Sequence, residues 1–118
     1  MAAHKRLIAG SDEVAECGRG LKFTVPDAQG AAQEAFVIRY QGHVYAYLNQ
    51  CAHVPVQLDW DNGEFFDYSK LYLLCSTHGA LYDPKTGACR GGRCNGRGLK
   101  ALPVIEEHHN IYLVEETT

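Results

Sequence analysis

The sequence predicts an all-β protein built from antiparallel strands. Short runs of alternating or wholly apolar residues recur along the chain, at 22–25, 35–40, 44–48, 71–74, 102–106 and 111–115. Turn residues separate these runs. Residues 11–16 alone favour a helical turn, with Ser11 as its cap and acidic residues near its N-terminus.

Two hairpins follow from the residues between these runs. Gln41-Gly42 lies between 35–40 and 44–48, and this short Gly-containing connection favours a tight turn. The runs 102–106 and 111–115 flank His108-His109-Asn110 and form the second hairpin. Elsewhere, the strand at 22–25 stops at Pro26, residues 27–33 are predicted as a loop, and a turn with well-placed Pro and Gly is predicted at 84–87.

Length and composition fit one soluble domain spanning residues 1–118. Hydrophobic residues make up 46% of the chain, enough for one core and too many for a disordered chain. No apolar run approaches the roughly 20 residues of a membrane helix, and residues 1–10 lack the apolar stretch of a signal peptide. We therefore expect a cytoplasmic protein that does not bind membranes.

Charge and cysteine content narrow the function further. The formal net charge of −3 argues against a protein that binds nucleic acid by neutralising phosphates. The chain has five cysteines and no predicted secretion signal, which favours metal or redox chemistry over a disulfide framework.

Two short motifs carry the predicted chemistry, Cys51-Ala52-His53 and Cys75-Ser76-Thr77-His78-Gly79. Each supplies one thiolate and one imidazole, and each follows a predicted strand. Four such ligands suit either zinc or an iron–sulfur cluster. Zinc sites usually place like ligands in each motif, whereas these motifs are mixed. Mixed motifs favour two irons, one held by Cys51 and Cys75 and the other by His53 and His78.

The pattern C-x-H followed by C-x2-H-G resembles the signature of the Rieske family. The stretch HGALYDPKTGAC and the Gly-rich loop before LKALPV are also similar to Rieske domains. The resemblance covers about residues 22–116, most closely 46–104. It implies the Rieske iron–sulfur fold, with stacked antiparallel sheets and a small cluster-binding subdomain of two loops at about 49–96. It also implies one Rieske-type 2Fe-2S cluster per chain.

In that resemblance the cluster ligands are Cys51, His53, Cys75 and His78. Gly79 and Tyr82 stand beside them, and the Tyr82 hydroxyl is expected to hydrogen-bond a ligand sulfur. Rieske proteins of cytochrome bc-type complexes carry further cysteines and a serine, where this chain has Val56, Thr77 and Ala80. Fewer hydrogen bonds to the sulfurs predict a potential in the lower part of the Rieske range of about −150 to +300 mV.

These departures make the chain most similar to soluble Rieske ferredoxins that serve ring-hydroxylating oxygenases. We expect a monomeric electron carrier and not an enzyme, without catalytic residues of its own. Its partners would be a flavin-dependent ferredoxin reductase and a terminal oxygenase. Two alternatives stay open: a small Rieske subunit of another oxidoreductase, such as an assimilatory nitrite reductase, and a structural zinc-binding module.

Several residues outside the motifs also receive predictions. Residues 89–94 form the expected third loop over the cluster. Cys89 and Cys94 are expected to be free thiols, and the alternative is a disulfide between them. Cys17 is expected to be a small buried residue. The remaining histidines are predicted at the surface or in turns: His4, His43, His108 and His109.

Residues 54–74 form a segment longer than in many such ferredoxins. Its aromatic residues are predicted to pack onto the cluster subdomain, and the alternative is a partner-docking surface: Trp60, Phe65, Phe66 and Tyr68. Acidic residues gather at 59–67 and basic residues at 90–100. We expect two solvated loops there, and the alternative is a dipolar surface that orients a partner.

Overall fold

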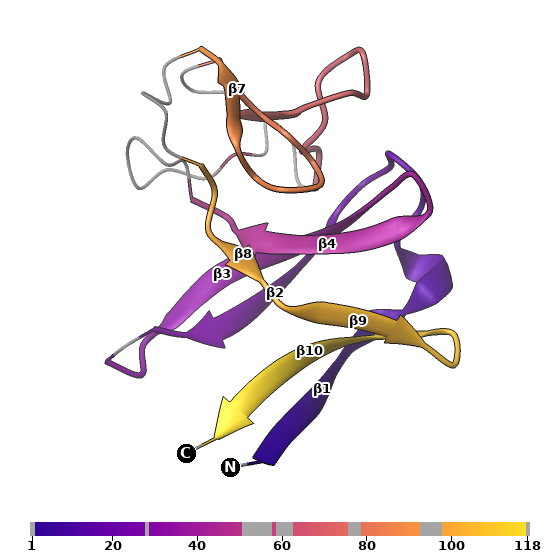
Figure 1. The fold of residues 1–118 in the computed structure, drawn as a ribbon, viewed down its shortest axis with the longest axis vertical. Coiled ribbons are helices and arrows are strands. Elements are labelled where there is room, and N and C mark those ends of the chain that lie inside the picture. The colour runs from indigo at the N-terminus through magenta and orange to yellow at the C-terminus, as the bar shows by residue number, and fades with distance from the viewer. Residues whose placement is uncertain are drawn as a thin grey trace.

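The structure, a computed structural model, describes residues 2–27, 29–50, 58, 63–75, 79–92 and 98–117. Within these ranges ten strands form three antiparallel sheets, so the predicted all-β class is confirmed. Figure 1 shows them as three layers, with both ends of the chain at the layer farthest from the small third sheet.

The first sheet has the order β1-β10-β9, from β1 (Ala2–Gly10), β10 (Asn110–Thr117) and β9 (Val104–Glu107). The second has the order β2-β3-β4-β8, from β2 (Leu21–Pro26), β3 (Ala32–Tyr40), β4 (His43–Leu48) and β8 (Ala101–Leu102). The third has the order β5-β6-β7, from β5 (Leu73–Cys75), β6 (Ala80–Tyr82) and β7 (Cys89–Gly91).

Both predicted hairpins are present. Gln41 and Gly42 join β3 to β4 with φ angles of 52° and 83°, the signs that a two-residue type I′ turn requires. His108 and His109 join β9 to β10 with φ angles of 53° and 64°. The strand predicted at 102–106 is instead divided at Pro103, which has no N–H to donate to a ladder. The chain therefore leaves the second sheet after β8 and enters the first sheet at β9.

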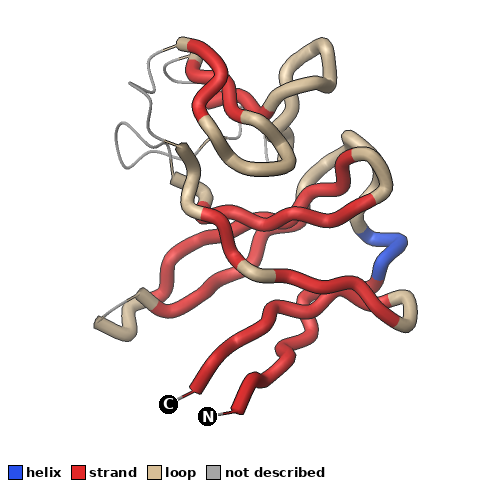
Figure 2. The backbone as a smooth tube through the Cα atoms, in the orientation of Figure 1, coloured by secondary structure: helices blue, strands red, loops and turns tan. Residues whose placement is uncertain are grey.

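The predicted helical turn is shorter than expected. It is a 3-10 helix, Ser11–Glu13, drawn as the one blue segment in Figure 2. Gly10, and not Ser11, is its N-cap, and the Gly10 N–H donates to the Glu13 carboxylate at 2.6 Å. The cap prediction was wrong because the acidic side chain reaches back to the residue before Ser11.

The middle sheet is buried on both faces because side chains of a strand alternate. On β3, Phe36 and Ile38 pack into a core shared with the small third sheet. Their neighbours Ala35 and Val37 face the other way, and Val37 packs with Ile111 of β10. This sandwich fixes the small sheet on a rigid base. Among the described residues, no helix has the length and apolar character to cross a membrane.

Candidate metal centre

The second predicted motif begins at the end of β5. Cys75 is the last residue of that strand; its side chain is fully buried and takes part in no disulfide. The Gly79 N–H donates to the Cys75 carbonyl at 2.7 Å, which turns the chain back into β6. The other three predicted ligands lie outside the described residues: Cys51, His53 and His78.

Two glycines bring the loop after β7 against this motif. Gly79 has a φ of +70° and Gly92 a φ of +77°, a region that glycine adopts without steric cost. A Cβ on Gly92 would lie 2.5 Å from the Gly79 carbonyl oxygen and 2.7 Å from the Ala80 Cα. Only a residue without a side chain therefore fits at Gly92, and the backbone that follows His78 is held in place.

Tyr82 lies in the middle of the small sheet. It is fully buried on β6, where it pairs with Leu73 of β5 and Cys89 of β7. Its strand is the one that pairs Ala80 with Cys75. Tyr82 therefore lies on the strand that pairs with the end of β5, where the second motif begins. The hydrogen bond from its hydroxyl to a ligand sulfur stays a prediction.

The predicted turn at 84–87 attaches this sheet to the middle layer. The Tyr47 hydroxyl of β4 donates to the Pro84 carbonyl at 2.8 Å, and burial raises the pKa of that phenol. The Leu99 N–H donates to the Gly87 carbonyl at 2.8 Å. Asp83 pairs with Arg90 at 2.9 Å; burial opposes ionisation of this carboxyl, yet the Arg90 hydrogen bond helps to keep its pKa below the ordinary value.

The family model of the Rieske [2Fe-2S] domain matches residues 7–109. The chain belongs to the Rieske [2Fe-2S] domain family. The family's cofactor is a Rieske-type 2Fe-2S cluster. The described part of the site fits this group, because it offers a buried cysteine outside any disulfide and, beside it, a close backbone contact at Gly92 that only glycine permits.

Solved structures share the fold of this Rieske domain. The ferredoxin of carbazole 1,9a-dioxygenase from Nocardioides aromaticivorans IC177 has a TM-score of 0.70 at 24% identity, covering 92% of this chain and 95% of that chain. The Sphingomonas yanoikuyae B1 ferredoxin has a TM-score of 0.67 at 22% identity, covering 96% and 100%. The terminal oxygenase of carbazole 1,9a-dioxygenase from the same Nocardioides strain has 0.73 at 22%, covering 98% and 31%. Among curated proteins no sequence match is found.

The cysteines outside the motifs differ from their predictions. Cys89 of the Rieske domain is disulfide-bonded and lies on a strand, so the prediction of a free thiol in a loop was wrong there. That prediction rested on a reducing compartment and on a ligand set that is complete without these cysteines, and not on geometry. Cys94 lies outside the described residues. Cys17 is only partly buried, and its Sγ lies 3.6 Å from both the Glu16 carboxylate and the Lys70 carbonyl.

The histidines outside the motifs follow the prediction where their side chains are described. His43, His108 and His109 are exposed at a strand start or in a turn. His4 lies on β1, and its side chain is outside the description. Within the described ranges, no three His, Cys, Asp or Glu side chains are grouped so as to hold a metal ion.

The aromatic residues of the segment 54–74 differ in how deeply they are buried. Phe65 and Phe66 are buried as predicted, and Phe65 stacks on Phe36 with ring centroids 3.8 Å apart. Tyr68 is fully exposed, so the packing prediction was wrong for this residue. Of the charged residues, Glu64 pairs with Arg19 at 3.1 Å. Several residues of these predictions lie outside the described residues: Trp60, Asp59, Asp61, Arg93 and Arg97.

Proposed function

We propose that this Rieske domain is a soluble electron carrier, a ferredoxin that takes single electrons from a flavin-dependent reductase and passes them to a terminal oxygenase. The observation that carries this proposal is the complete set of two cysteines and two histidines inside the matched region of the family. The similar ferredoxins, aligned over more than nine-tenths of the chain, support it.

The four residues of the two motifs would bind the two irons of the cluster in pairs. Cys51 and Cys75 would bind one iron, and His53 and His78 the other. When bound, the cluster accepts and releases one electron at a potential above that of an all-cysteine cluster, because neutral imidazoles replace two thiolates. The burial of Cys75 keeps water from its sulfur, and Gly79 and Gly92 hold the adjoining backbone.

The proposal includes how the protein works in the cell. It is a single domain over residues 1–118, acts in the cytoplasm as a monomer, and catalyses no reaction on a substrate. The fold is shared with an oxygenase as well as with ferredoxins. The ferredoxins are aligned over 95% and 100% of their own length and the oxygenase over 31% of its length, which supports a carrier.

Electron paramagnetic resonance of the purified protein, before and after dithionite, tests this function. We expect a signal only after reduction, with the low average g value of a histidine-ligated 2Fe-2S centre. Cys75→Ser should remove the signal and the iron. Cys17→Ser is the matched control, since Cys17 is also outside any disulfide, and it should retain both. A protein that contains zinc and gives no signal would contradict the proposal.

A further inference from the structure

An ordered loop projects from the segment that precedes β5. Residues 67–72 form this loop, which we call the Tyr68 loop, between Phe66 and Leu73, which pair as an isolated antiparallel bridge. The Asp67 carboxylate accepts hydrogen bonds from the Ser69 hydroxyl at 2.8 Å and from the Tyr72 N–H at 3.4 Å. The Asp67 N–H also donates to the Tyr72 carbonyl at 3.0 Å. The loop is therefore held in one shape by its own hydrogen bonds.

This ordered loop exposes apolar side chains. Tyr68 has a relative exposure of 101% and Leu71 of 53%. Among the described residues, the large hydrophobic side chains that are exposed are these two and Leu7. An exposed tyrosine is typical of a binding hot spot. Because the loop is already ordered, little conformational entropy is lost when it docks.

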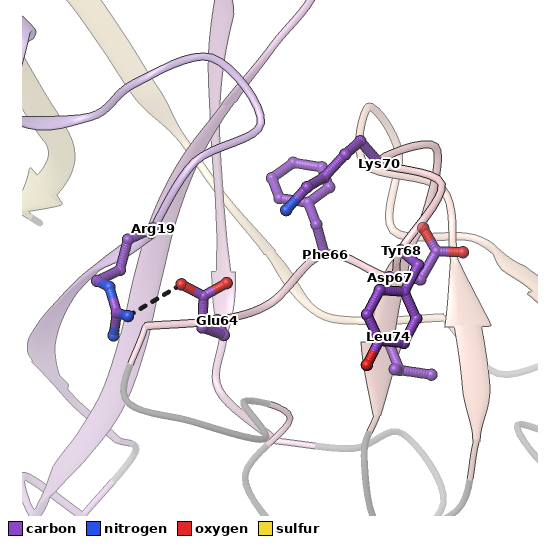
Figure 3. A pocket seen from close by; sticks show the side chains of 7 residues that line it. All are labelled: Arg19, Glu64, Phe66, Asp67, Tyr68, Lys70 and Leu74. Carbon is purple, nitrogen blue, oxygen red and sulfur yellow. Dashed lines mark ion pairs between the residues drawn. The ribbon is translucent and has the colours of Figure 1, made fainter.

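Two hollows border the loop. The first, of about 450 Å³, is lined by Phe66, Tyr68 and Leu74 together with charged side chains (Figure 3). The second, of about 330 Å³, is lined by residues that include Leu71 and Tyr72. Residues of the loop thus border two partly apolar hollows, which side chains of an opposing surface can fill.

The charge of this face differs from that of the whole chain. Among the described residues, the two hollows are lined by four cationic and three acidic side chains, whereas the chain carries a net charge of −3. Glu64 is paired with Arg19, and Asp83 with Arg90. The exposed Lys70 and Lys85 then outnumber Asp67, so these described side chains carry a small positive net charge, which complements an acidic partner surface.

The Tyr68 loop lies close enough to the predicted cluster site for one protein interface to cover both. Leu74 lines the first hollow, is held by a 2.8 Å hydrogen bond to the Phe65 carbonyl, and immediately precedes Cys75. Cys75 follows Leu71 by four residues, so a stretch of chain of at most roughly 14 Å separates them. A standard protein interface covers about 800 Å² on each partner, wide enough to include both.

We propose that the Tyr68 loop is the surface by which this protein docks on its terminal oxygenase, an inference that rests on the proposed function. Tyr68 and Leu71 enter an apolar hollow of the oxygenase, and Lys70 and Lys85 meet carboxylates around it. The loop contributes no ligand and no chemistry. It sets the orientation and lifetime of the complex in which one electron leaves the reduced protein and enters the oxygenase.

The test measures electron transfer from the dithionite-reduced protein to the carbazole 1,9a-dioxygenase terminal oxygenase from Nocardioides aromaticivorans IC177 by stopped flow. We expect Tyr68→Ala to lower the second-order rate constant about tenfold or more, as for an aromatic hot spot. Lys70→Glu should lower it and weaken its salt dependence. Leu71→Ala should lower it several-fold, whereas Leu7→Ala, which removes a similarly exposed leucine from β1, should leave it unchanged.

A parallel reaction with ferricyanide, which needs no docking surface, should run at one rate in the wild type and in the uncharged substitutions Tyr68→Ala, Leu71→Ala and Leu7→Ala. Equal rates to the oxygenase for Tyr68→Ala and Leu7→Ala would overturn the docking surface while leaving the proposed function intact. A wild-type protein that reduces ferricyanide but not this oxygenase would overturn it as well. A dimer in sedimentation that Tyr68→Ala dissolves would assign the loop to a second copy instead. Absence of the dithionite-dependent resonance signal would remove the proposed function itself.

Discussion

Arg39 on β3 binds Glu106 on β9 through paired contacts, one of them from Nη1 to Oε1 at 2.9 Å. The pair joins the first sheet to the middle sheet, and both side chains are largely shielded, at 16% and 25% exposure. The same guanidinium donates to the Val14 carbonyl at 2.9 Å and to the Ser11 carbonyl at 3.1 Å. One side chain thus connects two sheets and the 3-10 turn between them.

The Arg39–Glu106 pair should make stability depend on acid. The Arg39 hydrogen bond is the largest cause that lowers the pKa of Glu106 to about 2, although burial opposes it. Because the folded pKa lies below the ordinary value of 4.5, the stabilisation is complete above pH 4.5 and is lost as the pH falls toward 2. We expect Glu106→Gln to lower the free energy of unfolding by about 2 kcal/mol at pH 7.

Urea unfolding of the wild type and Glu106→Gln at pH 7, 4 and 2.5 measures this effect, and the difference should shrink with falling pH. Glu107→Gln is the control, since Glu107 is a neighbour paired with Lys5 at an exposed position. A difference between wild type and Glu106→Gln that stays constant with pH would show that the ion pair is not its source.

The β9–β10 turn should become more stable with glycine. His109 has a φ of +64°, which disfavours a residue with a Cβ. His109→Gly should therefore raise the free energy of unfolding by about 1 kcal/mol. His43→Gly, in strand β4 and without a positive φ, should lower it instead. Chemical denaturation measures the free energy of unfolding of the two variants. A lower value for His109→Gly than for the wild type would contradict backbone strain at His109.

Gly92→Ala should impair cluster incorporation because its Cβ would lie 2.5 Å from the Gly79 carbonyl oxygen. Gly30→Ala is the matched control: Gly30 has a φ of +86°, yet nothing lies within 4 Å of its added Cβ. Both variants should lose about 1 kcal/mol of stability from backbone strain, and Gly92→Ala should lose more because its Cβ also meets backbone atoms. Only Gly92→Ala should lose half or more of its iron, measured per folded chain with circular dichroism as the folding check. Equal iron in both would disprove the role of this contact.

The assignment of His78 as a ligand predicts the direction of a potential change. His78→Cys adds a negative thiolate to the cluster, so the reduction potential should fall, on the order of 100 mV, if the cluster still assembles. Spectroelectrochemical titration measures it, and His43→Cys, at an exposed histidine outside the motifs, should leave the potential unaltered. An unshifted potential in cluster-loaded His78→Cys would remove His78 from the ligand set.

Local signals in the sequence predicted the hairpins, because a Gly-containing turn and its flanking strands are close together. β1 was not predicted: its residues alternate poorly, and its pairing with β10 depends on residues at the far end of the chain. Pro103 marked the division between β8 and β9, but only the two different pairing partners reveal that the chain changes sheets.

The candidate site shows the same limit. The ligand motifs identify the family, yet the sequence does not separate Phe65, which meets Phe36 and the backbone at Gly20, from the exposed Tyr68 three residues later. Whether Phe65 or Tyr68 is buried depends on which side chains of the middle sheet face the segment 54–74. The disulfide at Cys89 was missed because the expected compartment, and not the distance between thiols, decided the prediction.

The pairing of β1 with β10 has a consequence for synthesis on the ribosome. Ala2 pairs with Thr117 and Gly10 with Asn110, so β1 waits for about a hundred later residues before its partner exists. At translation rates of roughly 5–20 residues per second, that wait lasts on the order of 5–20 s. During it the middle sheet can form from its local hairpin, whereas the backbone donors and acceptors of β1 have no strand partner and bind water. The sheet that holds both ends of the fold is therefore the last to assemble.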